Sequence, residues 1–203
     1  MTRSKGWNRV IICAMLGVTV AATGVSAQDR SQIRANEQGF QQMETRLATL
    51  NAKGVPLTDY HLAKAQAWLD FSKEEYFDND RSGIVETTFA EAVKLIEQLE
   101  SGITASLEMT TPLLEGPTRL ETDSWEKTES FKRSKLDCAA HLIARLEVQL
   151  VHVEHEIHEL GQIHAAPYRQ AVQRMVEELK TIECSPHAKQ KSEVPKESPS
   201  PGP

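Results

Sequence analysis

The feature that most constrains this chain is a run of apolar residues spaced alternately three and four positions apart. The eight positions are Leu136, Ala139, Ile143, Leu146, Leu150, Val153, Ile157 and Leu160. Such a spacing, held over more than three heptads, is typical of a long helix with one continuous buried face. Val148 and Val151 lie off that face, so we expect neighbours to cover more than one side of the helix. The run predicts the central helix of a bundle.

Shorter segments with the same helical period surround the long helix. We expect them over residues 28–51, about 59–77, 84–100 and 167–182, with Thr58 or Asp59 as the cap of the second. A short, weakly patterned helix over 123–133 either stands alone or forms the start of the long helix. No segment alternates apolar and polar residues as a strand would. The sequence therefore predicts an all-α bundle of five to six helices, stapled by a disulfide.

The first 27 residues have the features of a signal peptide. Three basic residues among the first nine precede an apolar run over 10–24, and small residues lead up to Ala27. We expect cleavage before Gln28. The alternatives are an uncleaved anchor and a lipoprotein. Cys13 lies in the middle of the apolar run, away from the cleavage boundary that a lipid-modified cysteine requires.

The remainder reads as one helical domain over 28–184 and a tail over 185–203. Removal of the leader takes away three positive charges, which changes the formal net charge from −6 to −9. An acidic chain disfavours nucleic acid and anionic lipid surfaces as partners. The tail is rich in proline and serine and has no large apolar residue, which is typical of a disordered tether or spacer.

Two cysteines remain after the leader, Cys138 and Cys184. An even number in an exported chain indicates a disulfide. Cys138 opens the long helix and Cys184 ends the last one, so an antiparallel arrangement of the two helices brings their ends together. Two unrelated buried thiols are the alternative.

Three histidines on the long helix suggest a metal hypothesis. They are His152, His155 and His158, with glutamates among them. Neighbours three positions apart on a helix can reach one ion, but the third ring is rotated by about 120° from the first. We expect a solvated polar face, with adventitious zinc or copper binding and a dedicated site as the alternatives. His164 falls on the apolar face, and we expect it to be buried.

The turn before the third helix begins like a calcium loop. The oxygen ligands at the first, third and fifth positions would come from Asp78, Asp80 and Ser82. Gly83 follows at the sixth position, but Phe89 occupies the position that requires a bidentate glutamate, for which Glu86 could only partly substitute. We expect a tight interhelical turn in which Asp80 or Ser82 caps the next helix. Calcium binding is the alternative.

The sequence does not predict an enzyme or a cofactor. Both mature cysteines are assigned to the disulfide, and no glycine-rich phosphate loop is present. Secreted helical chorismate mutases share the size, leader and disulfide, but their site needs several converging arginines. Arg46 and Lys53 are the only candidates in the first helix and its exit.

Part of the sequence resembles a known family. The segments are YHLAKAQAWLDFSKEEYFDNDRSGIVETTFAEAVKLI from residue 60, CAAHLIARLEVQLVHVEHE from 138 and GQIHAAPY from 161. They resemble the helical N-terminal region of exported OmpA-family proteins of Gram-negative bacteria. The resemblance implies export, a helical fold and a setting in the cell envelope. It does not carry over peptidoglycan binding, because the sequence contains no GHTD-like segment of the family's usual second domain. The family's pattern is also altered at Gln162 and Ile163.

These observations together predict a non-enzymatic protein of the periplasm, with peripheral association to the outer membrane left open. We expect a structural or interaction module whose grooves between helices receive an envelope protein. The alternative is a periplasmic metal-binding protein that uses the face from His152 to His158.

Overall fold

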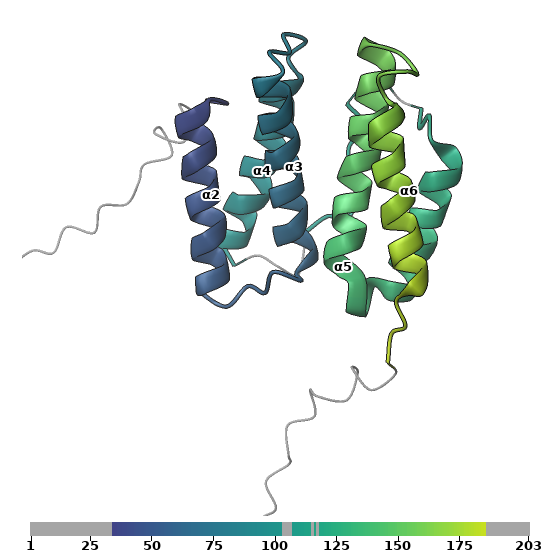
Figure 1. The fold of residues 1–203 in the computed structure, drawn as a ribbon. Helices are drawn as coiled ribbons and strands as arrows, with labels where there is room; N and C mark the ends of the chain where they lie inside the picture. Colours follow the sequence, from purple (N-terminus) through teal and green to yellow (C-terminus); the bar gives the residue numbers. More distant parts are fainter. Residues whose placement is uncertain (1–33, 103–106, 115, 117, 186–203) are drawn as a thin grey trace, which may run out of the picture. The chain divides into compact units, whose positions relative to one another are not determined.

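The computed structural model describes residues 34–102, 107–114, 116 and 118–185. The predicted leader and the tail after Ser185 lie outside these ranges. Within them the fold is entirely helical, as predicted, with no strand (Figure 1). The helices are α2 (Glu37–Ala52), α3 (Tyr60–Phe77), α4 (Ile84–Glu100), α5 (Thr122–Glu159) and α6 (Ala166–Thr181).

Local capping explains where the first two of these helices begin. The side chain of Asn36 accepts a hydrogen bond of 2.9 Å from the amide of Gly39, so α2 begins at Glu37, well after the expected start at residue 28. Asp59 caps α3 as predicted and accepts from the amides of His61 and Leu62.

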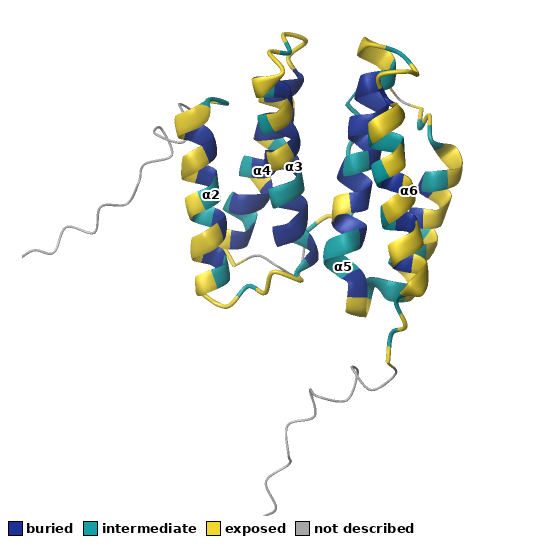
Figure 2. Ribbon diagram, viewed as in Figure 1, coloured by how far each residue is buried: buried dark blue, intermediate teal, exposed yellow. Residues whose placement is uncertain are grey.

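Helix α3 lies between other helices on most of its surface. It packs against α4 on one side and α5 on another, and α2 contacts both α3 and α4. Figure 2 shows buried residues along much of α3. Among them, Ala63 and Ala65 are small enough to allow close approach, and larger side chains fill the core. Ala65, Trp68 and Leu69 have no exposed surface. Because so much of α3 is covered, its polar residues are also drawn into helix interfaces, as Lys64 and Glu75 are.

Helix α5 consists of two arms that fold back on each other at Ala139. The backbone of Ala139 departs from helical geometry, with φ −132° and ψ 24°. The indole of Trp125 in the first arm donates 2.8 Å to Glu154 in the second, and Lys132 lies 2.6 Å from Glu147. Residues almost equally far before and after the bend are thus in contact. The short helix predicted over 123–133 lies in the first arm. The apolar run crosses the bend, since Leu136 precedes it, and its residues from Ile143 to Ile157 belong to the second arm.

The predicted disulfide is present. Cys138 and Cys184 are bonded, with Cα atoms 5.8 Å apart. The bond joins the bend of α5 to the segment that follows α6, and α5 and α6 pack along each other. Lys135 strengthens this end, because its ammonium group donates to the backbone oxygens of Leu179 and Ile182 at 2.6 and 2.7 Å.

The apolar face of the second arm is buried in its middle but not at its end. Ile143, Leu146 and Leu150 are fully covered, whereas Leu160 is exposed. The expectation that His164 is buried is wrong: it lies exposed in the turn between α5 and α6. The chain leaves the helix at Leu160, so the helical period no longer decides which side chains face the core.

Glu147 forms the centre of a buried polar network between α3 and α5. Its carboxylate lies 3.1 Å from the ammonium of Lys64, and it accepts hydrogen bonds from Tyr60 and from Thr111. Lys132 reaches the other carboxylate oxygen. Each group in this network has a partner of opposite charge or a hydrogen bond. The network therefore holds the segment over residues 107–114 against α3 and α5.

None of the helices that the structure describes has the length and hydropathy needed to cross a bilayer.

Reduction of the disulfide should destabilise the fold. The bond closes a loop with a sequence separation of 46, and the chain-entropy model assigns such a bond about 4 kcal/mol. We expect urea denaturation of the reduced protein to give a free energy of unfolding lower by about that amount. The Cys138→Ser/Cys184→Ser double variant is the control and should not respond to reductant. Equal midpoints for oxidised and reduced wild type would contradict this expectation.

Replacement of Glu147 should be costly near neutral pH. The Glu147→Gln variant leaves Lys64 and Lys132 without their carboxylate, and the loss of one partner from a buried pair costs about 3–5 kcal/mol. The matched control is Glu177→Gln, which breaks an exposed pair with Lys180 and should cost less than about 1 kcal/mol. Urea denaturation at pH 7 measures both. Similar values for the two variants would show that the buried network contributes no more than a surface pair.

The difference between wild type and Glu147→Gln should shrink in acid. Burial alone would raise the pKa of Glu147, but the charge of Lys64 and the hydrogen bonds of Lys132 and Tyr60 hold this pKa below its ordinary value of 4.5. A carboxylate with a lowered pKa contributes stability above its unfolded value and loses it as the pH falls. We therefore expect the free energies of unfolding of wild type and Glu147→Gln to converge as the pH falls below about 4.5. A difference independent of pH would contradict this assignment.

Candidate metal centre

Four side chains on one face of α5 contribute to a polar cluster at the C-terminal end of its second arm. They are His152, His155, Glu156 and Glu159. Their spacing of three, four and seven positions places them on the same side of a helix. This side faces α3 and the turn that follows it, and the cluster is completed from there by Glu75 and Asp80.

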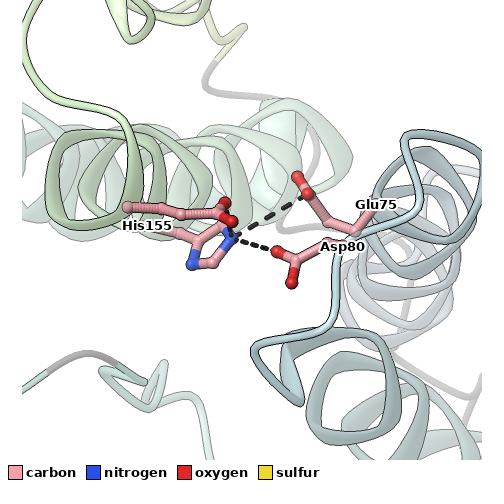
Figure 3. A group of neighbouring side chains, drawn as sticks. Glu75, Asp80 and His155 are labelled. Carbon is pink, nitrogen blue, oxygen red and sulfur yellow. Dashed lines mark hydrogen bonds and ion pairs between the residues drawn. The ribbon is translucent and has the colours of Figure 1, made fainter.

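The turn between α3 and α4 directs Asp80 toward α5. Asn79 adopts a left-handed conformation with φ 61°, and the amide of Asp80 donates 3.0 Å to the backbone oxygen of Glu75. One carboxylate oxygen of Asp80, Oδ1, accepts from the amide of Ser82. The other oxygen, Oδ2, is left to face His155 (Figure 3).

The first half of the cluster surrounds His155. Its Nε2 lies 2.9 Å from Oδ2 of Asp80 and 3.3 Å from Oε2 of Glu159. Oε2 of Glu75 is 3.8 Å away, and Figure 3 shows both Glu75 and Asp80 pointing toward the imidazole. One nitrogen and three carboxylate groups thus approach a common point from α3, its following turn and α5.

The second half surrounds His152. Its Nε2 lies 2.7 Å from Oε1 of Glu75 and 3.7 Å from Oε1 of Glu156. Although the first of these contacts is short, the two atoms are not aligned for a hydrogen bond, and neither forms a hydrogen bond to another group in the part of the chain that the structure describes. Two ligand atoms bound at right angles to one ion at about 2.1 Å are themselves about 3 Å apart. The spacing fits two ligands at right angles on one ion, and it equally fits an ion pair with a protonated imidazole.

The cluster carries buried negative charge without a lysine or arginine. The side chains of Glu75, Asp80 and Glu156 are only 4, 3 and 7% exposed. Among the described residues, their ion pairs are all with histidines. Converging carboxylates repel one another, and burial increases the cost unless positive charge is supplied. Protonated imidazoles or bound cations are the two ways to supply it.

The field of the carboxylates is visible in the pKa values of the cluster. Burial lowers the pKa of His152, but the carboxylates of Glu156 and Glu75 outweigh it and the net shift is upward. Burial and the charge of Asp80 raise the pKa of Glu159. Burial acts in opposite directions on the two groups, but the neighbouring carboxylates favour the protonated form of both. A site with excess negative charge favours the bound state of any cation, a proton included.

Aromatic rings enclose His152 and limit access to it. The ring of Phe71 stacks on the imidazole at 3.9 Å, and the ring of Tyr168 lies 4.2 Å away on α6. Tyr168 is itself held by a 3.2 Å hydrogen bond to Glu74. The cavity that reaches His152 measures about 110 Å³, whereas small-molecule sites are typically about 300–1,000 Å³. This space suits water or an ion and not an organic substrate.

The two metal hypotheses from the sequence each supplied part of this one cluster. His152 and His155 are buried, so the expectation of a solvated face is wrong for them; it holds for His158, which is exposed. Helix packing against α3 covers the first two rings, and the 3.6-residue period rotates the third away.

The calcium loop, the alternative for this turn, is not supported by the positions of its residues. Asp78 is exposed and ends α3, and Ser82 accepts a 3.3 Å hydrogen bond from the amide of Ile84 at the start of α4. Phe89, at the closing position, is buried in the core. The expected tight turn is present, but the N-cap of α4 is Gly83, without a side-chain cap, in place of Asp80 or Ser82. Asp80 has instead a role toward His155 that the sequence did not reveal.

Sequence reasoning did not identify Glu75, which joins both halves of the cluster. A signal was present: Glu75 lies four residues after Phe71, on the apolar side of α3, where a charged residue is unexpected. Glu156 and Glu159 were visible only as neighbours of the histidines.

The arginine-based alternative finds no support in the geometry. Arg46 forms an ion pair of 2.6 Å with Glu100, and Lys53 is exposed at the end of α2. The two cationic groups that a dicarboxylate site would need are therefore not assembled by these residues.

Comparison of the chain with models of known protein families, with curated proteins and with solved structures finds no match. The geometry of the cluster is therefore the basis on which a function is proposed.

Glu75 should respond to substitution in the opposite way to Glu147, although both are buried glutamates between α3 and α5. In chelator at pH 7.5, Glu75→Gln removes one of several mutually repelling carboxylates, so we expect the free energy of unfolding to be unchanged or higher. Glu147→Gln under the same conditions is the matched comparison. A loss of about 3 kcal/mol or more for Glu75→Gln would show that Glu75 acts as a structural ion-pair partner.

Proposed function

We propose that this protein is an exported, non-catalytic metal-binding protein that holds divalent transition-metal ions between α3 and α5. The observation that carries this proposal is the short, unaligned contact between Oε1 of Glu75 and Nε2 of His152, two buried atoms with no hydrogen-bond partner among the described residues. A cation between carboxylates and imidazoles would satisfy both atoms.

The ligand types favour a particular class of ion. Imidazole nitrogens and carboxylate oxygens suit Zn²⁺, Mn²⁺, Fe²⁺ and Co²⁺, whereas Cu⁺ prefers thiolates. Cys138 and Cys184 are bonded to each other and offer no thiolate. Oxygen ligands alone would favour calcium or magnesium, but each half of the cluster includes a histidine.

The periplasm remains the proposed compartment. The basic and apolar leader supports export, and a disulfide is typical of chains that mature in an oxidising environment. Metal buffering or storage fits the enclosed cluster better than catalysis, because the ligands are buried and the cavity beside His152 is small.

An envelope interaction module is the second candidate function. Three large apolar side chains, Phe77, Leu160 and Ile163, are exposed at 64, 53 and 86%. They lie at the end of α3 and where the chain leaves α5 for α6, and they would suit a protein partner. Capture from envelope extract by wild type but not by an Ile163→Ser variant, with or without metal, would favour this function.

Metal binding can be measured directly on the mature, oxidised protein after removal of metals with chelator. At a free ion concentration of one hundred times Kd, a ligand adds about 2.7 kcal/mol of stability. We expect Zn²⁺ or Mn²⁺ to raise Tm by about 5–10 °C and to give a calorimetric binding signal at micromolar concentration.

The third histidine of α5 provides the control for this measurement. The His152→Ala/His155→Ala variant should lose the shift in Tm, and His158→Ala should keep it, because His158 is exposed and outside the cluster. Absence of heat and of a thermal shift with Zn²⁺, Mn²⁺ and Co²⁺ in wild type would refute metal binding.

Export can be tested separately in a Gram-negative host. We expect the full chain to be recovered from the periplasm with a new N-terminus at Gln28 and an intact disulfide, as read by N-terminal sequencing and intact mass. Recovery of an unprocessed product with both thiols free would refute export.

A further inference from the structure

We propose that the cluster is a dinuclear centre in which the carboxylate of Glu75 bridges two divalent ions. This inference rests on the proposed metal binding and adds its stoichiometry and architecture. Its starting point is that the two oxygens of Glu75 face different histidines. Oε1 lies 2.7 Å from Nε2 of His152, and Oε2 lies 3.8 Å from Nε2 of His155.

The ligands divide into two sets that share only Glu75. One set consists of Glu75, His152 and Glu156, and the other of Glu75, Asp80, His155 and Glu159. Within each set, one ligand atom per residue lies within 4.8 Å of the others. One ion cannot satisfy both sets, because the two histidines belong to different groups and direct their Nε2 atoms at different oxygens of Glu75. A carboxylate that binds one ion through each oxygen is a common bridge in two-metal sites, where the ions are about 3.5–4 Å apart.

The charge of the ligands also indicates two ions. The four carboxylates of Glu75, Asp80, Glu156 and Glu159 carry a formal charge of −4, and the two imidazoles are neutral when they bind metal. Two divalent ions neutralise this charge completely. A single ion would leave an excess of −2 in a region where, among the described residues, the three most buried carboxylates have no lysine or arginine partner.

The two positions differ in their number of protein ligands. The position beside His155 has four protein ligands and the position beside His152 has three. The ion beside His155 should therefore bind more tightly than the ion beside His152. The aromatic rings of Phe71 and Tyr168 fix the plane of His152. This arrangement orients the nitrogen of the poorer position before the ion arrives.

The experiment measures ions per chain and the coupling between them. Mature, oxidised, chelator-stripped protein is titrated with MnCl₂ and, separately, with ZnCl₂. Native mass spectrometry and elemental analysis then give the number of ions per chain, and electron paramagnetic resonance of the manganese form reports whether two ions share a bridging ligand. We expect two ions per chain, bound in two steps, and a broadened exchange-coupled signal in place of the hyperfine pattern of an isolated ion.

Variants separate the two positions. His152→Ala and His155→Ala should each bind one ion and show the isolated pattern. Glu75→Gln should lose the coupled signal. His158→Ala and Asp78→Asn are the matched controls, since each lies within three residues of a ligand but outside both sets, and both should keep two ions. Circular dichroism of each variant checks that the helices are retained.

The outcomes distinguish this inference from the metal binding on which it rests. One ion per wild-type chain, lost in both single histidine variants, would overturn the dinuclear centre and leave metal binding intact. Two ions without coupling would overturn the bridge through Glu75. Failure of the wild type to bind any ion would overturn both proposals.

Discussion

The packing of α3 against α5 is the interaction on which the rest of the structure depends. It covers a helix whose residues are apolar on several sides, and it brings charged side chains of both helices out of water. Lys64 and Glu75 are eleven residues apart on α3, about 16 Å along its axis. The interface therefore has room for two separate polar groups, one around Glu147 and one around Glu75.

These two groups solve the problem of buried charge in different ways. Glu147 lies between two lysines and accepts hydrogen bonds from two hydroxyl groups, so its negative charge is balanced by the protein itself. Among the residues that the structure describes, Glu75 forms ion pairs with histidines alone, and each of them is shared with further carboxylates. A protein interior tolerates unbalanced charge poorly. The imbalance is thus informative, because protein side chains balance the charge of the first group and, over the described ranges, lysine and arginine do not balance that of the second.

Much of the fold could be read from the sequence, since helix periods, the Asp59 cap and the pairing of Cys138 with Cys184 depend on local patterns or on simple counting. The bend at Ala139 could not, because neither glycine nor proline lies there to interrupt the helix. The sequence indicated only separate parts of the cluster. Whether His152 faces water or a neighbour depends on which face of α5 meets α3, and that contact joins residues about eighty positions apart. Asp80 required the geometry of its turn, where one oxygen is occupied by Ser82 and the other is free to face His155.

The bend of α5 has a consequence for how copies of this chain could associate. The residues around Ala139 are compatible with an uninterrupted helix, so straightening would cost the backbone little. In a straightened α5, the first arm would leave its own second arm and could pack on that of another copy, an exchange known as domain swapping. Cys138 lies next to the bend and is tied to Cys184 beyond α6. The covalent bond therefore fixes the hinge itself to the end of α6, so an exchange of first arms would still leave the second arm and α6 of each copy joined.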